Sequence, residues 1–173
     1  MTFTNLVARH QPLGSGFPFE RIVGWEPVDH ALPTNPRCRR MVTNSAHFQY
    51  RRDEIEISRA RRDVRHFLAH HRLPSDVIDD LELVVVELVT NAVEHGAGKR
   101  VVVDLEMMPN AVSMSVVQDG AADLGDPSSW VMPPKETRSG RGLALVRRLV
   151  DDVEWSAVAG RLRVSVDRQH GIG

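Results

Sequence analysis

The chain lacks several features that would place a protein in a secreted or membrane-bound class. Cys38 is the only cysteine in 173 residues, which excludes an intramolecular disulfide and a cysteine-rich zinc site. No apolar run approaches the roughly 20 residues that a membrane helix needs, and no basic-then-apolar signal pattern opens the chain. We therefore expect a soluble protein of the cytoplasm, a reducing compartment, without membrane contact.

An excess of charge of one sign is also missing. Twenty-two basic residues stand against 23 acidic ones, for a formal net charge of -1. This balance gives no electrostatic argument for direct contact with nucleic acid. The sequence also contains no phosphate-binding Gly-x4-Gly-Lys-Ser/Thr loop, no dinucleotide GxGxxG and no nucleophile triad. Most familiar enzyme classes are therefore excluded.

The first 52 residues differ in composition from the rest. Their prolines interrupt helices and central strands, and they are Pro12, Pro18, Pro27, Pro33 and Pro36. The stretch "FPFERIVGWEPV" at residues 17–28 is nevertheless too apolar for a simple spacer. We interpret residues 1–52 as an N-terminal arm. It either docks partly on the domain or on a partner, or it is a disordered tail.

From residue 53 to residue 168 the pattern is regular, beginning with two helices. The first helix is expected to end before Pro74, and its apolar positions at helical spacing are Ile57, Ala60, Val64, Phe67 and Leu68. Ser75 then offers an N-cap for a second helix, which meets no glycine or proline until Gly96. That run is too long for a strand, despite its three consecutive valines.

Two hairpins and a third helix follow. Apolar and polar residues alternate over 101–107 and over 112–116, with a Pro-Asn pair between them, which predicts an antiparallel hairpin with one buried face. "GRGLALVRRLVDD" at 140–152 predicts a helix, and 153–168 predicts a final hairpin. The expected fold class is α+β: a two-layer sandwich of a mixed, mostly antiparallel sheet with about three helices on one face. Residues 169–173 form a tail.

The stretch "LELVVVELVTNAVEHGAG" at 81–98 places polar groups on the expected second helix. With about 100° per residue, Asp80, Glu87, Asn91 and Glu94 share a narrow sector beside the apolar arc. Glu87 and Asn91 are one turn apart and can converge on one point. A carboxylate beside an amide oxygen suits Mg²⁺, and a carboxylate can also act as a general base. Alternatively, the stripe is the solvated edge of an amphipathic helix.

Two later segments favour a binding site over a solvated edge. In "VVQDG", Asp119 stands where a strand ends, where it can accept a hydrogen bond from an exocyclic amine such as that of adenine. In "TRSGRGLALV", Gly140 and Gly142 open a helix whose free N–H groups favour a phosphate, with Arg138 and Arg141 beside them. Asp-Gly is also an ordinary turn, and the two glycines can simply ease a helix start.

The order and spacing of these three segments resemble the Bergerat-fold ATPases, the family of histidine-kinase catalytic domains, Hsp90, MutL and type II topoisomerases. "ELVTNAVEH" at 87–95 looks like the N box, and "QDGAAD" at 118–123 stands at the place of the first glycine box. "SGRGLALV" at 139–146 looks like the second glycine box. The resemblance covers about residues 53–168. It is strongest to single-domain bacterial anti-sigma-factor serine kinases and related ATP-binding regulatory proteins.

The resemblance implies ATP and Mg²⁺ as cofactors. Asn91 would be a ligand of the Mg²⁺ that bridges the ATP phosphates, and Glu87 would be the general base for a substrate serine. Asp119 would bind the adenine amine, with residues 124–139 as a lid. Arg138 would contact the terminal phosphate. The other residues expected at the nucleotide are His95, which is either structural or close to the phosphates, and Ala121, Ser139, Gly140, Arg141, Gly142 and Leu143.

The first glycine box departs from the family pattern Asp-x-Gly-x-Gly. Here Ala121 and Asp123 replace both of its glycines. Ala121 still fits if its φ is negative, whereas Asp123 adds negative charge near the phosphates. We therefore expect a weakened nucleotide affinity on an intact fold.

Three functions follow from this pattern. The first is an ATP-binding regulator of anti-sigma-factor type that sequesters a sigma factor, phosphorylates a serine of a small STAS-type antagonist protein, or does both; the family also suggests a homodimer. The second is a non-catalytic partner-binding module on a degenerate ATPase scaffold. The third is a two-component sensor catalytic domain, with His66, His70 or His71 as phosphoacceptor. "AHHRLP" lacks the acidic residue that usually follows an acceptor, which favours ordinary surface histidines near a helix end.

Overall fold

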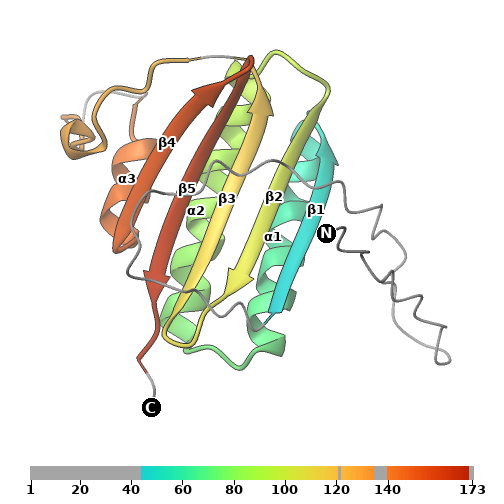
Figure 1. The fold of residues 1–173 in the computed structure, drawn as a ribbon, viewed down its shortest axis with the longest axis vertical. Helices are drawn as coiled ribbons and strands as arrows, with labels where there is room; N and C mark the ends of the chain where they lie inside the picture. Colours follow the sequence, from blue (N-terminus) through green and yellow to red (C-terminus); the bar gives the residue numbers. More distant parts are fainter. Residues whose placement is uncertain (1–43, 121, 135–139, 172–173) are drawn as a thin grey trace, which may run out of the picture. The chain divides into compact units, whose positions relative to one another are not determined.

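The computed structural model describes residues 44–120, 122–134 and 140–171. These residues form one five-stranded sheet in the order β1-β2-β3-β5-β4, with three α-helices packed on one face (Figure 1). Every neighbouring pair of strands is antiparallel. The expected α+β sandwich is therefore confirmed.

The two predicted hairpins are both present. β2 (Arg100–Met107) and β3 (Ala111–Asp119) are closed by a turn in which Met108 N–H donates to Ala111 O at 2.8 Å. β4 (Asp152–Val158) and β5 (Arg161–Gln169) are joined through a pair of residues with positive φ, Ala159 at 51° and Gly160 at 74°. Two consecutive positive φ angles match the right-handed twist of a tight hairpin.

β1 (Asn44–Arg51) was not expected as part of the domain. The proline-rich composition predicts residues 44–51 as part of the N-terminal arm, whereas the structure pairs them with β2 as an edge strand. Alternate side chains of β1 turn towards the helices, and Tyr50 at its end is buried. The domain therefore begins before residue 53. The rest of the expected arm, residues 1–43, lies outside the described residues.

The helices begin and end close to their expected bounds. α1 (Glu54–His70) is capped by Asp53, whose side chain accepts a hydrogen bond from Ile55 N–H at 3.1 Å. α2 (Ser75–His95) has Pro74 rather than Ser75 at its N-cap, without a side-chain cap hydrogen bond. The expected Ser75 cap is therefore wrong, because the helix already includes that residue. α3 (Gly142–Leu149) is the predicted third helix.

α2 is the central helix of the layer, with α1 on one side and α3 on the other (Figure 1). Its apolar face fills the core against the inward residues of the sheet. The α2 residues that are at most 3% exposed include Leu81, Val84, Val85, Leu88, Val89 and Ala92. Within the described ranges, no helix is long and apolar enough to cross a membrane.

A buried carboxylate joins α1 to α2. Glu82 is only 4% exposed, and its Oε2 lies 2.9 Å from Nη1 of Arg65 and 3.5 Å from Nη2 of Arg61. Both arginines are largely exposed, so their charges keep their hydration while they neutralise the buried group. This pairing explains how a polar residue is accommodated among the apolar residues of α2.

Candidate functional site

Glu87 and Asn91 meet the first residue of α3. A Cβ placed on Gly142 would lie 2.7 Å from Glu87 Oε2 and 3.6 Å from Asn91 Nδ2. The two polar side chains therefore converge on one point, as their one-turn spacing predicts. Any larger residue at position 142 would have to displace the Glu87 carboxylate, so the close approach favours glycine at this position.

A cavity of about 240 Å³ adjoins this point, between α2, the ends of β3 and β5, and the start of α3. Its wall is mainly apolar, with three polar side chains, those of Asn91, His95 and Gln118. Drug-sized ligands occupy pockets of about 300–1,000 Å³, so this space suits one ring system rather than a whole nucleotide. The remaining lining residues are Leu88, Val116, Ala122, Leu124, Gly140, Gly142, Leu143, Leu162 and Val164.

Glu87 lies beside the cavity rather than in its wall. Its side chain is partly buried and faces the N-terminal end of α3, where the free N–H groups favour a negative charge. Among the described residues, no basic side chain forms an ion pair with Glu87. A carboxylate held in this way can still accept a proton or a metal ion.

The second glycine box is only partly described. Gly140 has a φ of 79°, in the left-handed region that favours glycine, and both Gly140 and Leu143 line the cavity. Arg141 donates through Nη2 to the carbonyl of Pro134 at 3.3 Å, which connects the two ends of the 134–141 segment. Arg138 and Ser139 lie outside the described residues. The contact of Arg138 with the terminal phosphate, and the place of Ser139 at the nucleotide, stay predictions.

Asp119 does not line the cavity. Its carboxylate packs against Gly98, where a Cβ would lie 2.0 Å from Oδ2, and its Oδ1 is 3.5 Å from Nε of Arg161. Its carbonyl accepts a hydrogen bond from Ala97 N–H at 2.9 Å. The expected contact with an adenine amine therefore stays a prediction, and Ala121 lies outside the described residues.

Gln118 is a lining residue that the sequence analysis missed. It continues the inward series of Val112, Met114 and Val116 on β3, with a polar group at the last position. That alternation is a signal that could have found it, since every second residue of a strand shares a face. The side-chain amide of Gln118 can both donate and accept hydrogen bonds within the cavity.

The segment after β3 forms local turns instead of placing free charge in the cavity. Asp123 Oδ1 accepts a hydrogen bond from Gly125 N–H at 2.9 Å, so this carboxylate builds a turn. Asp126 does the same for Ser128 N–H at 2.8 Å, and this hydrogen bond lowers the pKa of Asp126. The Asp123 carboxylate keeps its negative charge but is held in a turn and does not line the cavity, so the expected repulsion of phosphates stays a prediction.

Two tryptophans hold the start of the expected lid. Trp155 of β4 donates through Nε1 to the carbonyl of Gly125 at 2.6 Å, and Trp130 donates to the carbonyl of Leu124 at 2.8 Å. Leu124 thereby forms one edge of the cavity. The lid was expected over 124–139, of which 135–139 lie outside the described residues.

The residues around Gly142 fit a magnesium ion held mainly by a ligand. Mg²⁺ is usually bound through one or two protein oxygens together with phosphates and water. Glu87 and Asn91 supply a carboxylate and an amide at one point. No group of three or more acidic, histidine or cysteine side chains suited to a metal occurs within the described residues. A metal here would therefore depend on a phosphate ligand.

The candidate phosphoacceptor histidines belong to the domain itself. His66 and His70 lie in α1, and His71 caps its C-terminal end with its ring centroid 4.7 Å from that of Phe67. Burial lowers the pKa of His71. A sensor kinase carries its acceptor on a separate dimerisation helix, whereas α1 packs on α2. This placement favours ordinary histidines near a helix end over a phosphoacceptor role.

Comparisons with known proteins agree with this geometry. Residues 50–166 match the family model described as the histidine kinase-like ATPase domain. The fold is similar to the crystal structure of the RsbU and RsbW domains of Rv1364c from Mycobacterium tuberculosis, with a TM-score of 0.58 and 22% sequence identity over 75% of this chain. The match spans 33% of that longer chain. A comparison with curated proteins gives no match. The chain belongs to the histidine kinase-like ATPase domain family.

Proposed function

We propose that this chain is an ATP-binding regulatory protein of anti-sigma-factor type, and that it transfers a phosphoryl group to a serine of a small STAS-type antagonist protein. The observation that carries the proposal is the convergence of Glu87 and Asn91 on Gly142 beside an apolar cavity. The N box, which contains both side chains, is the most specific of the three motifs shared with anti-sigma-factor serine kinases.

Each part of the site has a role in this proposal. The cavity takes the adenine ring, with Gln118 offering hydrogen bonds at its wall. Asn91 provides an oxygen for Mg²⁺, which neutralises phosphate charge when it is bound. Glu87 takes the proton of the attacking serine hydroxyl, since its carboxylate has no competing ion pair among the described residues. Phosphoryl transfer depends mainly on positioning and charge neutralisation, and these groups supply both.

The partners are part of the same proposal. A sigma factor and a STAS-type antagonist are expected from the motif resemblance, and the fold shared with the RsbU–RsbW structure is consistent with that class. A cytoplasmic location and a homodimer also belong to the proposal. Analytical ultracentrifugation of the full chain tests the homodimer directly.

Calorimetric titration of ATP and Mg²⁺ into the full chain tests nucleotide binding. We expect micromolar affinity, about -8 kcal/mol, and loss of detectable binding in Asn91→Ala. Asn110→Ala is the matched control, because Asn110 lies in the β2–β3 turn and does not line the cavity. A folded wild-type chain that binds no ATP would refute the proposal.

Glu87→Gln separates catalysis from binding. The variant should still bind ATP but should lose about 100-fold or more of its transfer rate to an antagonist serine, the usual contribution of a general base. Radiolabelled phosphate transfer measures this directly. Equal transfer by wild type and Glu87→Gln would exclude Glu87 as the base.

A second function, partner binding without catalysis, is favoured by one observation. Ala121 and Asp123 replace both glycines of the family pattern, and the Asp123 carboxylate accepts a hydrogen bond within a turn. In that case the chain would bind its protein partner without nucleotide. Partner binding that is unchanged by ATP and by Asn91→Ala would support this second function.

A further inference from the structure

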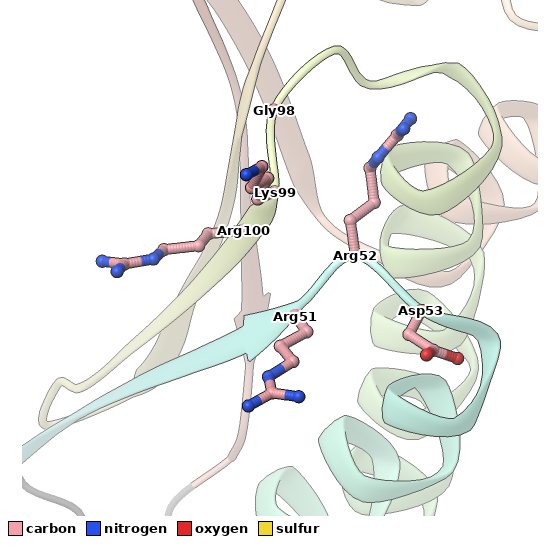
Figure 2. A pocket seen from close by; sticks show the side chains of 6 residues that line it. All are labelled: Arg51, Arg52, Asp53, Gly98, Lys99 and Arg100. Atoms are coloured by element: carbon pink, nitrogen blue, oxygen red, sulfur yellow. The ribbon is translucent and has the colours of Figure 1, made fainter.

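A second pocket lies outside the site described above, where β1 runs into α1 and the loop after α2 enters β2. Its volume is about 400 Å³. Figure 2 shows the residues that line it, which come from two chain segments, and they are Arg51, Arg52, Asp53, Gly98, Lys99 and Arg100. We call it the basic pocket.

Two of the charged groups in the basic pocket are already engaged. Arg52 donates through Nη1 to the carbonyls of Val93, at 3.3 Å, and of Gly96, which satisfies free carbonyls at the end of α2. Asp53 caps α1 through its side chain. The one carboxylate of the pocket forms no ion pair with the pocket's arginines among the described residues, and its single negative charge stands against four positive ones.

Three further cations have no carboxylate partner in the part of the chain that the structure describes. The side chains of Arg51 and Lys99 make no hydrogen bond or ion pair with any described residue. Arg100 lies beside the neutral amide of Gln49, whose oxygen, when it faces the guanidinium, accepts from Nη1 at 2.8 Å. Counted over its lining residues, the pocket carries four positive charges against one negative charge, on a chain whose net charge is -1.

The directions of these side chains indicate what kind of anion they suit. In Figure 2 the guanidinium groups of Arg51, Arg52 and Arg100 point away from one another. A single phosphate would have to be contacted by converging donors, as in bidentate arginine sites. Several carboxylates spaced along a segment match diverging cations better.

The surface beyond the pocket limits the length of that segment. Arg100 shares the outer face of β2 with Asp104 and Glu106, since alternate residues of a strand face the same way. Asp104 Oδ1 lies 2.6 Å from Nδ1 of His47. A long polyanion such as nucleic acid would be repelled there, whereas a short acidic segment would not reach it.

We propose that the basic pocket binds a short acidic segment of a protein partner, through Arg51, Lys99 and Arg100. This second binding site shares no lining residue with the nucleotide cavity and does not require bound nucleotide. It would give the partner a contact on residues that are separate from the wall of the first cavity.

The probe for this proposal is fluorescently labelled hexaglutamate, titrated with the full chain at low ionic strength and followed by anisotropy. Arg51→Gln combined with Lys99→Gln should weaken binding by about tenfold or more, and added salt should weaken binding to the wild type. The matched control is Arg59→Gln combined with Arg62→Gln, which removes the same charge from the exposed surface of α1. That pair should change affinity by less than about twofold.

Three outcomes would overturn the proposal. The first is the absence of hexaglutamate binding to the wild type, and the second is an equal loss in both double variants, which would mean diffuse attraction. The third is tighter binding of single-stranded oligothymidylate than of hexaglutamate through Arg51 and Lys99. A hexaglutamate-induced shift of the Gly98 amide resonance locates the site. Asn91→Ala should bind hexaglutamate like wild type, so failure at the nucleotide site leaves this test intact.

Discussion

Glu82 and Glu87 lie little more than one turn apart on α2, and they face different neighbouring helices. Glu82 faces α1, is 4% exposed and pairs with two arginines. Glu87 faces α3, meets the backbone of Gly142, and forms no ion pair with the described residues. A paired carboxylate stabilises a helix interface, whereas an unpaired carboxylate beside a cavity remains available for chemistry. Changes at or beside each residue test this distinction.

The largest effect is expected from Gly142→Ala. The new Cβ would lie 2.7 Å from Glu87 Oε2, so the flexible carboxylate must move and the site around Asn91 is disturbed. ATP affinity should fall by about 100-fold, about 2.7 kcal/mol, as measured by calorimetry. Gly171→Ala is the matched control, because a Cβ there meets no atom within 4 Å. Unchanged affinity in Gly142→Ala would remove the steric argument for the site.

The next largest effect is expected at Glu82, the buried carboxylate that pairs with two arginines. Glu82→Gln removes the buried charge that pairs with Arg65 at 2.9 Å, and it should lower the free energy of unfolding by about 2 kcal/mol. Urea denaturation measures this loss, and ATP affinity should stay at the wild-type value. Asp79→Asn is the control, because the Asp79–Arg65 pair is exposed and 3.4 Å long, so its loss should cost less than about 0.5 kcal/mol.

A smaller effect is expected on the β1 side of α1, at another paired carboxylate. Tyr50 is buried, and its hydroxyl donates to Asp63 Oδ2 at 3.1 Å. Tyr50→Phe should lower the free energy of unfolding by about 1 kcal/mol at neutral pH, the value of one hydrogen bond. If the free energy of unfolding of Tyr50→Phe equalled that of the wild type, water would replace the tyrosine hydroxyl at Asp63 without loss.

The same residue predicts a dependence on alkaline pH. Burial, followed by the charge of Asp63, raises the pKa of Tyr50 above its ordinary value of 10.0. The contribution to stability is therefore complete below about pH 10 and is lost as the pH rises above it, because only the unfolded chain then ionises readily. Tyr50 is the only tyrosine, so tyrosinate absorbance reports it without overlap. Tyrosinate appearing at pH 10 in the folded chain would contradict this prediction.

The smallest effect on stability is expected at Glu87 itself. Glu87→Gln keeps the shape of the side chain and breaks no ion pair with a described residue, so the free energy of unfolding should change by less than about 0.5 kcal/mol. Urea denaturation beside Glu82→Gln provides the comparison. Equal losses at both positions would end the distinction between a structural and a functional carboxylate.

Sequence periodicity was sufficient where the interactions are local. The convergence of Glu87 and Asn91 follows from one helical turn, and the β2–β3 hairpin follows from alternation around a Pro-Asn pair. These features depend on residues that are close in the chain. Both predictions are confirmed for that reason.

The missed features depend on contacts between distant segments. β1 is an edge strand that is stabilised by pairing with β2, and its residues follow a proline-rich stretch that hid the alternation. Leu162 and Val164 reach the cavity because β5 lies beside β3, an order that periodicity does not contain. The position of Asp119 against Gly98 likewise depends on how the 96–99 loop packs on the end of β3.

The 96–99 loop contacts both the end of β3 and the basic pocket, so binding at the two sites can be coupled. Ala97 donates its N–H to the carbonyl of Asp119, while Lys99 accepts from Arg52 N–H at 2.9 Å and lines the basic pocket. An occupant of the basic pocket that shifts the loop would also shift the end of β3, and with it the affinity for a nucleotide. Linkage then requires reciprocity: the nucleotide must change the affinity of that occupant by the same factor.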